Sequence, residues 1–109
     1  MIRRFRVQGA SMAPTLRDGD RIWALLWPFK WLRPGMVVLA THPRHGLLIK
    51  RLARVDHAQL RFQLSSDNTE PVVHGCDEWL PRSTLLARVV AAPRSLKAPE
   101  APGEPIRIE

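Results

Sequence analysis

Several short stretches of the chain alternate apolar and polar residues with a period of two. Residues 3–9 place Phe5 and Val7 on one face, and residues 58–67 alternate around Phe62 in the same way. A two-residue period is typical of a half-buried strand, because successive side chains of a strand point to opposite faces. We therefore predict strands at both segments.

The other apolar stretches are short and are separated by turn residues. Asp18-Gly19 and the RPG sequence at 33–35 are turn signals, and Pro28 ends an apolar run. Residues 83–92 also fit a short helix, but their paired valines favour a strand. The pattern predicts four more strands, at residues 21–27, 36–42, 47–56 and 83–92. Short strands at this spacing indicate a mostly-β fold, a curled sheet or partial barrel.

The chain of 109 residues is long enough for one hydrophobic core. Its last part, residues 93–109, contains four prolines and has no hydrophobic periodicity. We expect a single domain over residues 1–92, followed by a proline-rich, mobile tail over 93–109.

The composition indicates what kind of partner the protein binds and in which cellular compartment it occurs. The 17 Lys and Arg residues outnumber the 10 Asp and Glu residues, which gives a net charge of +7. A field of this sign favours nucleic acid, anionic lipid or an acidic partner. The single cysteine, Cys76, cannot form an internal disulfide, and the longest apolar run, 22–29, is too short to span a membrane. We find no secretory signal pattern and expect a cytoplasmic protein.

Ser11 lies in a turn of small residues, GASMAPT, and is the candidate nucleophile. A serine hydroxyl needs a base to remove its proton. The four histidines, which are the usual bases, have no evident carboxylate partner in sequence, so a Ser-His-Asp triad stays an open alternative. These histidines are His42, His45, His57 and His74.

A lysine is the rarer base, and Lys50 stands in the middle of the apolar stretch GLLIKRLARV. Such a side chain either reaches out to water or keeps its amine away from water. Burial disfavours the ammonium and lowers the pKa of a lysine, and a neutral amine can take a proton from a serine. The sequence of this stretch does not decide whether the Lys50 amine is exposed or buried.

Two separated motifs give the chain a family resemblance. GASMAPTLRDGD, followed by PGMVV and IKRL, resembles the Ser–Lys peptidases of the signal peptidase I and LexA-type superfamily. The resemblance implies a LexA-like, signal-peptidase-like curled sheet. It also implies that Ser11 is the nucleophile and Lys50 its general base.

The same resemblance assigns roles to the neighbours of Ser11. The backbone N–H of Ser11 would donate a hydrogen bond in the oxyanion hole. Some relatives have a second oxyanion donor at the position that Gly9 occupies here. Gly9 and Ala10 would keep the turn narrow enough for a substrate strand to approach, with substrate contacts at Ala10 and Met12. No cofactor is implied.

The segment LSSDN at 64–68 resembles a stretch that closes the fold in this superfamily. Signal peptidases follow that stretch with a Ser-x-Asp-Ser-Arg segment that orients the lysine, and this chain lacks it. We expect Ser65, Ser66 or Thr69 to hold Lys50 instead.

Similarity to RRFRVxGxSMxPTLxxGD and LLIKRLAR points to the short, anchorless peptidases that mature nickel-type superoxide dismutases. A substrate with a leader peptide, cleaved in trans, is therefore expected, since residues 3–9 are committed to a strand. A self-processing LexA-like regulatory domain is one alternative. An inactive basic module that binds membrane or nucleic acid is another, although nucleic acid is the less favoured partner.

Two further groups of residues are candidate binding sites. Trp23, Trp27 and Trp31 are four residues apart and suit either a core or a peripheral membrane contact. An exposed patch there would also suit an oligomer. His42-x-x-His45 and His74-x-Cys76 have no helix to align them, so no metal site is expected.

Overall fold

The computed structural model describes residues 1–26, 32–68 and 78–97 of the chain. In this part of the chain, antiparallel strands form one sheet, which confirms the predicted mostly-β, curled fold. The elements are β1 (Ile2–Arg6), β2 (Arg21–Leu26), β3 (Val37–His42), β4 (Gly46–Asp56), β5 (Arg61–Ser65), β6 (Leu80–Pro81), a 3₁₀ turn (Arg82–Thr84) and β7 (Leu85–Ala91).

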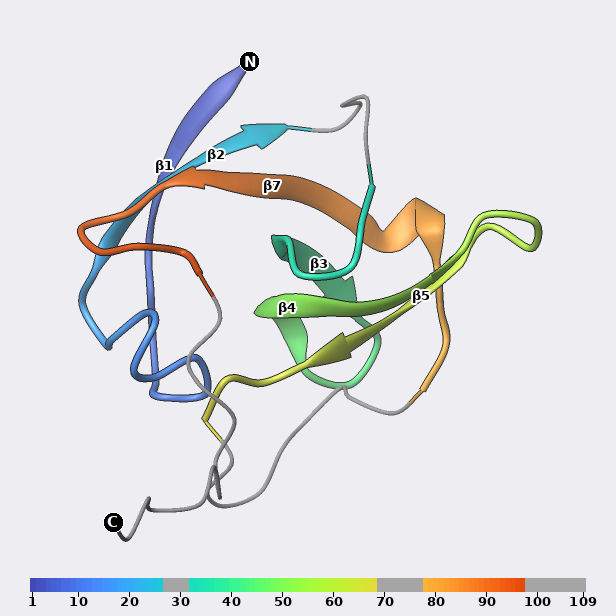
Figure 1. The fold of residues 1–109 in the computed structure, drawn as a ribbon, viewed down its shortest axis with the longest axis horizontal. Helices are drawn as coiled ribbons and strands as arrows, with labels where there is room; N and C mark the ends of the chain where they lie inside the picture. The colour runs from blue at the N-terminus through green and yellow to red at the C-terminus, as the bar shows by residue number, and fades with distance from the viewer. Residues whose placement is uncertain (27–31, 69–77, 98–109) are drawn as a thin grey trace, which may run out of the picture.

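The strand order in the sheet is β1-β2-β7-β3-β4-β5-β6, so β7 is inserted between β2 and β3. Figure 1 shows the sheet curling, with β1 crossing behind β2 and β7. Because of this curl, Phe5 of β1 packs near Leu39 of β3 and Ile49 of β4, although β1 is not a neighbour of either strand in the sheet. The curl therefore creates a space between β1 and the β3–β4 hairpin.

Both faces of the central strands are buried, which explains the unbroken apolar sequence of β3. Val37 packs in one core cluster with Ile22, and Val38 packs in a second cluster with Phe62. Alternate side chains of β3 therefore pack in two different core clusters. The second core lies under the long β4–β5 hairpin, and the first lies under the turn that carries Ser11.

The strand limits differ from the predicted ones at several ends. β1 ends at Arg6 rather than at residue 9, because Gly9 adopts a positive φ of 85°. β7 begins only at Leu85, after a 3₁₀ turn. Two-residue strand β6 was not predicted, since a pair of residues carries no detectable period. None of the helices in the described residues is long and apolar enough to cross a membrane.

Residues 93–97 of the predicted tail contact the domain. The Arg94 guanidinium binds both carboxylate oxygens of Asp20, and Leu96 packs against the cluster of Val7 and Met12. Contacts with the domain thus extend at least to residue 96. Residues 98–109 of the predicted tail lie outside the described residues.

Candidate active site

A tight turn after β1 carries Ser11. Val7 exchanges backbone hydrogen bonds with Asp20 and Gly19, each of 2.8 Å, which closes the chain between β1 and β2 into a loop. Inside this loop, the Gly9 N–H donates to the Asp18 carboxylate at 2.8 Å. The positive φ of Gly9 is a conformation that glycine adopts without strain.

The side chains after Ser11 fix the turn from below. Met12 and Leu16 are fully buried in the core cluster under the turn, while Ala10 is exposed and Ser11 half-buried. A substrate contact from Met12 would therefore involve its backbone. Asp20 accepts a hydrogen bond from the Arg17 N–H at 2.8 Å, as expected of a turn cap.

Lys50 lies in β4, directly opposite Val38 of β3, and only 3% of its surface is exposed. Its Nζ donates to the Ser66 hydroxyl at 2.6 Å. Of the three hydroxyls expected to hold Lys50, Ser66 makes this contact. Ser65 accepts no such bond and donates weakly to the Arg51 carbonyl at 3.5 Å, and Thr69 lies outside the described residues.

Ser11 and Lys50 line the same pocket, together with Gly9 and Ala10. Among the described residues no hydrogen bond joins the Ser11 and Lys50 side chains, although both line this pocket. Catalytic hydrogen bonds are often long in the absence of substrate and tighten in the complex. The rest of the pocket wall comes from Gln8 and from the β3–β4 hairpin, through His45, Leu47, Leu48 and Ile49.

The segment after β5 ties the Ser11 turn to β4. The backbone N–H of Asn68 donates to the Ser11 carbonyl at 2.9 Å, and its side-chain amide donates to the Ala10 carbonyl at 2.8 Å. Ser66, two residues earlier, binds Lys50. One three-residue segment, residues 66–68, therefore contacts both the serine turn and the lysine.

Asp67, in the middle of this segment, forms a buried bidentate pair with Arg51. The two bonds measure 2.8 Å from Nε and 2.6 Å from a terminal nitrogen, and both side chains are buried. Asp67 also accepts the Thr15 hydroxyl, and Arg51 donates to the Gly35 carbonyl at 2.7 Å. No local sequence pattern predicts this ion pair. Its only signal was the polar run SSDN after an alternating strand.

Among the described residues, no hydrogen bond joins a histidine to Ser11, although His45 lines its pocket. His42 is buried, its Nδ1 accepts the backbone N–H groups of Arg44 and His45, and its Nε2 lies 2.6 Å from Glu78. Since Nδ1 accepts, Nε2 carries a proton and donates to the Glu78 carboxylate. This hydrogen bond lowers the pKa of Glu78 below its ordinary value of 4.5.

His45 stacks on His42, with ring centroids 4.5 Å apart, and lines the Ser11 pocket. No cluster of three potential metal ligands occurs within the described residues. His74 and Cys76, the other pair weighed as ligands, lie outside them.

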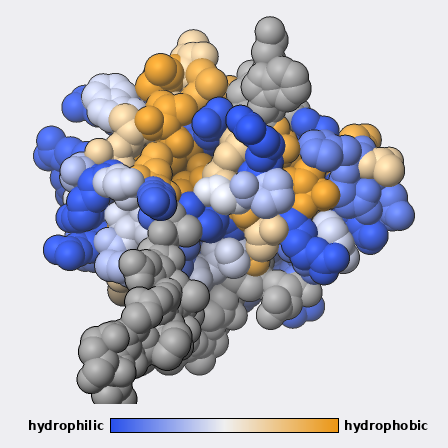
Figure 2. Space-filling view, viewed as in Figure 1, coloured by the Kyte–Doolittle hydropathy of each residue, from blue (hydrophilic) through white to orange (hydrophobic). Residues whose placement is uncertain are grey.

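Only the first of the three tryptophans can be placed. Trp23 is 45% exposed on β2, and the Arg4 guanidinium lies 5.4 Å from its ring centroid. Trp27 and Trp31 fall outside the described residues. Apolar side chains gather over the upper part of the molecule, where β2 and β7 run in the same view, with hydrophilic ones beside them (Figure 2).

Comparison with protein families gives one match. The family model described as Peptidase S24-like matches residues 3–75, a range that contains both Ser11 and Lys50. Comparisons with curated proteins and with solved structures give no match.

Proposed function

Because the chain belongs to the Peptidase S24-like family, a family of serine peptidases, we propose that it is an endopeptidase with Ser11 as nucleophile and Lys50 as general base. The observation that carries this proposal is the buried Lys50 amine, held by Ser66 in the pocket that Ser11 also lines. A module that only binds a partner has no need of a lysine amine inside its core.

The proposed reaction begins with the neutral Lys50 amine. It removes the proton of the Ser11 hydroxyl while the Ser11 oxygen attacks the scissile carbonyl. The Ser11 N–H stabilises the oxyanion, a contribution of about 3–4 kcal/mol for one donor in comparable sites. The Lys50 ammonium then gives its proton to the leaving amine. In the second half, Lys50 activates water, which hydrolyses the acyl-enzyme and returns Ser11.

Burial supports the role of Lys50 as a base. Removal of water disfavours the ammonium and so favours the neutral amine that the first step needs. The Ser66 hydroxyl fixes the direction of the amine without adding a charge. A carboxylate in its place would stabilise the ammonium and work against the reaction.

Substrate binding in an extended form would suit the walls of the pocket. β1 and the first part of β4 flank the site, and either strand can pair with an extended chain. Because β1 is paired with β2 over its whole length, residues 2–6 are not free to act as substrate, which favours cleavage of another polypeptide. Self-processing, as in LexA-type domains, is the alternative.

The finer identity of the substrate rests on sequence similarity. The motifs RRFRVxGxSMxPTLxxGD and LLIKRLAR support a leader peptide on a second protein, with a nickel-type superoxide dismutase precursor as the first candidate. Nickel would then belong to the substrate. We place the reaction in the cytoplasm, with exposed Trp23 as the point of peripheral membrane contact.

A library of proteome-derived peptides tests the proposed reaction without a known substrate. We expect the wild-type protein to generate a defined set of new N-termini, measured by mass spectrometry, and expect Ser11→Ala and Lys50→Met to generate none. Ser65→Ala is the matched control, because Ser65 does not contact Lys50, and it should cleave as the wild type does.

Two outcomes would contradict the proposal. Unchanged cleavage by either variant would remove that residue from the mechanism. A wild-type protein that cuts no library peptide, but shortens itself on incubation as seen by intact mass, would favour the self-processing alternative.

A further inference from the structure

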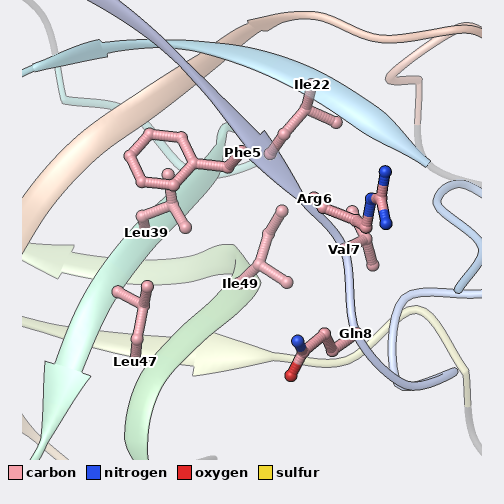
Figure 3. Close-up of a pocket in the computed structure, with 8 residues that line it drawn as sticks. All are labelled: Phe5, Arg6, Val7, Gln8, Ile22, Leu39, Leu47 and Ile49. Atoms are coloured by element: carbon pink, nitrogen blue, oxygen red, sulfur yellow. The ribbon is translucent and has the colours of Figure 1, made fainter. Parts of the chain in front are cut away.

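An apolar groove leads away from the Ser11 pocket along β1. Gln8, Leu47 and Ile49 line both the Ser11 pocket and the next hollow, as Figure 3 shows for the latter. Phe5 and Leu47 in turn line both this hollow and a third one nearer the start of β1. The three hollows therefore form one continuous groove that ends at the proposed nucleophile.

β1 borders this groove and has an open edge. It pairs only with β2 among the described strands. Val7 bonds toward the β2 side, and so does the Met1 carbonyl, which accepts from Leu26. Because antiparallel pairs bond at alternate residues, the N–H and C=O groups of Arg4 and Arg6 point to the open edge. An extended polypeptide could pair there.

Side chains alternate along β1 between the groove and the outer face. Phe5 points into the groove, and Figure 3 shows the Arg6 guanidinium turned away from the apolar side chains. Arg4 lies on the outer face, over the ring of Trp23. The groove side is thus apolar around Phe5, although Arg6 also lines the middle hollow and Arg3 the third one, and Arg4 lies on the other side.

The basic side has no carboxylate partner in the described part of the chain. The arginine ion pairs found there involve Arg51, Arg61 and Arg94. Arg4 and Arg6 form none, and together with Phe5 and Arg21 they line a further hollow. Their positive charge is therefore available to a bound partner.

We infer that the open edge of β1 binds an extended segment of the substrate in which apolar residues alternate with acidic ones. The inference rests on the proposed function, since the groove ends at Ser11. In an added strand, every second side chain would enter the groove beside Phe5. The side chains between them would face Arg4 and Arg6, where opposite charges on directly facing residues are favourable. The seven residues from Arg3 to Gly9 are separated by six steps, about 20 Å at roughly 3.3 Å per residue if they are extended.

An acidic peptide fits these observations better than a nucleic acid or a lipid surface does. The arginines repeat every two residues, which is the period of a strand. A phosphate backbone would not use the open N–H and C=O groups, nor the apolar groove on the other side of β1. A peptide with alternating side chains uses all three features.

Binding to the Ser11→Ala protein tests the inference separately from catalysis. The probes are two fluorescent octapeptides: three Leu-Glu repeats followed by Ala-Ala, and the same peptide with every Glu replaced by Lys. We expect the Glu peptide to bind about tenfold more tightly by fluorescence anisotropy, because two facing pairs change from attractive to repulsive in the Lys peptide.

The variant Arg4→Glu/Arg6→Glu, made in the Ser11→Ala protein, should abolish or reverse this preference. Arg17→Glu/Arg33→Glu is the matched control, since both arginines are exposed, lie outside β1 and give the same change in net charge. If the Arg4→Glu/Arg6→Glu protein fails to fold, Arg4→Gln/Arg6→Gln removes the positive charges without introducing negative ones. This variant should reduce the preference for the Glu peptide.

Equal affinity for the two peptides, no binding of either, or an equal loss in the control variant would overturn the inference. So would tighter binding of a 20-nucleotide poly(dT), or of phosphatidylserine vesicles, that the β1 variant loses and the control keeps. None of these results bears on the Ser–Lys mechanism, because the peptide-library cleavage by the protein with Ser11 intact decides that separately.

Discussion

Lys50 combines burial with a titratable amine, and the combination is costly for a protein core. Only 3% of its surface is exposed, so the amine loses nearly all of its hydration. The hydrogen bond to Ser66, at 2.6 Å, replaces one of the lost contacts with water. A core lysine held in this way is more easily explained by chemistry than by stability, because an apolar side chain would fill the site at lower cost.

Replacing Ser66 should affect catalysis more than folding. In Ser66→Ala the amine loses the hydroxyl that holds it, and a hydrogen bond between neutral groups is worth about 0.5–1.5 kcal/mol. We expect kcat to fall up to about tenfold with KM unchanged, measured on a peptide taken from the library cleavage.

Two further variants separate positioning from a general loss of structure. Ser66→Thr keeps the hydroxyl and should recover most of the activity, whereas Ser65→Ala should behave as the wild type. A Ser66→Ala protein with full kcat would mean that another group orients Lys50.

At the scale of elements, the segment after β5 joins three parts of the chain. Asp67 binds Arg51 of β4 and Thr15 of the serine turn, and Asn68 binds the carbonyls of Ala10 and Ser11. The two proposed catalytic residues belong to different elements, so their relative position depends on this segment. Its hydrogen bonds reach both the serine turn and Lys50.

Asp67→Asn should destabilise the protein strongly. It removes the negative partner of a buried Arg51, and breaking one side of a buried pair costs about 3–5 kcal/mol. Urea unfolding would measure this loss. Asp56→Asn is the matched control, because its pair with Arg61 is partly exposed and should contribute far less. An equal loss of unfolding free energy in Asp67→Asn and Asp56→Asn would show that the buried Arg51–Asp67 pair stabilises the fold no more than the partly exposed pair does.

At the scale of the whole molecule, the chain after β7 returns to the loop before β2. Arg94 binds Asp20, and this hydrogen bond, together with the Arg17 N–H, holds the pKa of Asp20 below its ordinary value of 3.8. The pair therefore ties residues 92–96 to the base of the serine turn. A carboxyl whose pKa is lower in the folded state stabilises the fold above its unfolded pKa, and the contribution disappears as the pH falls through the lowered value.

This pair predicts a pH-dependent effect of Arg94→Gln. The variant should be less stable than the wild type at pH 6, and the difference should shrink at pH 3, because below pH 3.8 the Asp20 carboxyl of the unfolded chain is protonated and must lose its proton to form the pair. Urea unfolding at both pH values measures it, with Lys97→Gln on the same segment as control. A difference that stays constant between pH 6 and pH 3 would contradict the role of Asp20.

The prediction of the fold succeeded where the signal was local. Residues 36–42 and 47–56 were predicted as strands, and β3 and β4 occupy nearly the same ranges. Two-residue β6 has no period to detect, and the insertion of β7 between β2 and β3 has no local signal at all. Sequence patterns report which face of an element is apolar but not which element covers it.

The sequence by itself determined the strands, the serine turn and the presence of a lysine in an apolar strand, because each is a property of a few neighbouring residues. Only the tertiary structure decided that Ser66 binds Lys50, that Asp67 binds Arg51 and that Asn68 binds the carbonyl of Ala10. These partners lie 16 to 58 positions apart in the chain, so no local pattern could select them. The curl of the sheet brings them together, and the same curl opens the groove between β1 and the β3–β4 hairpin.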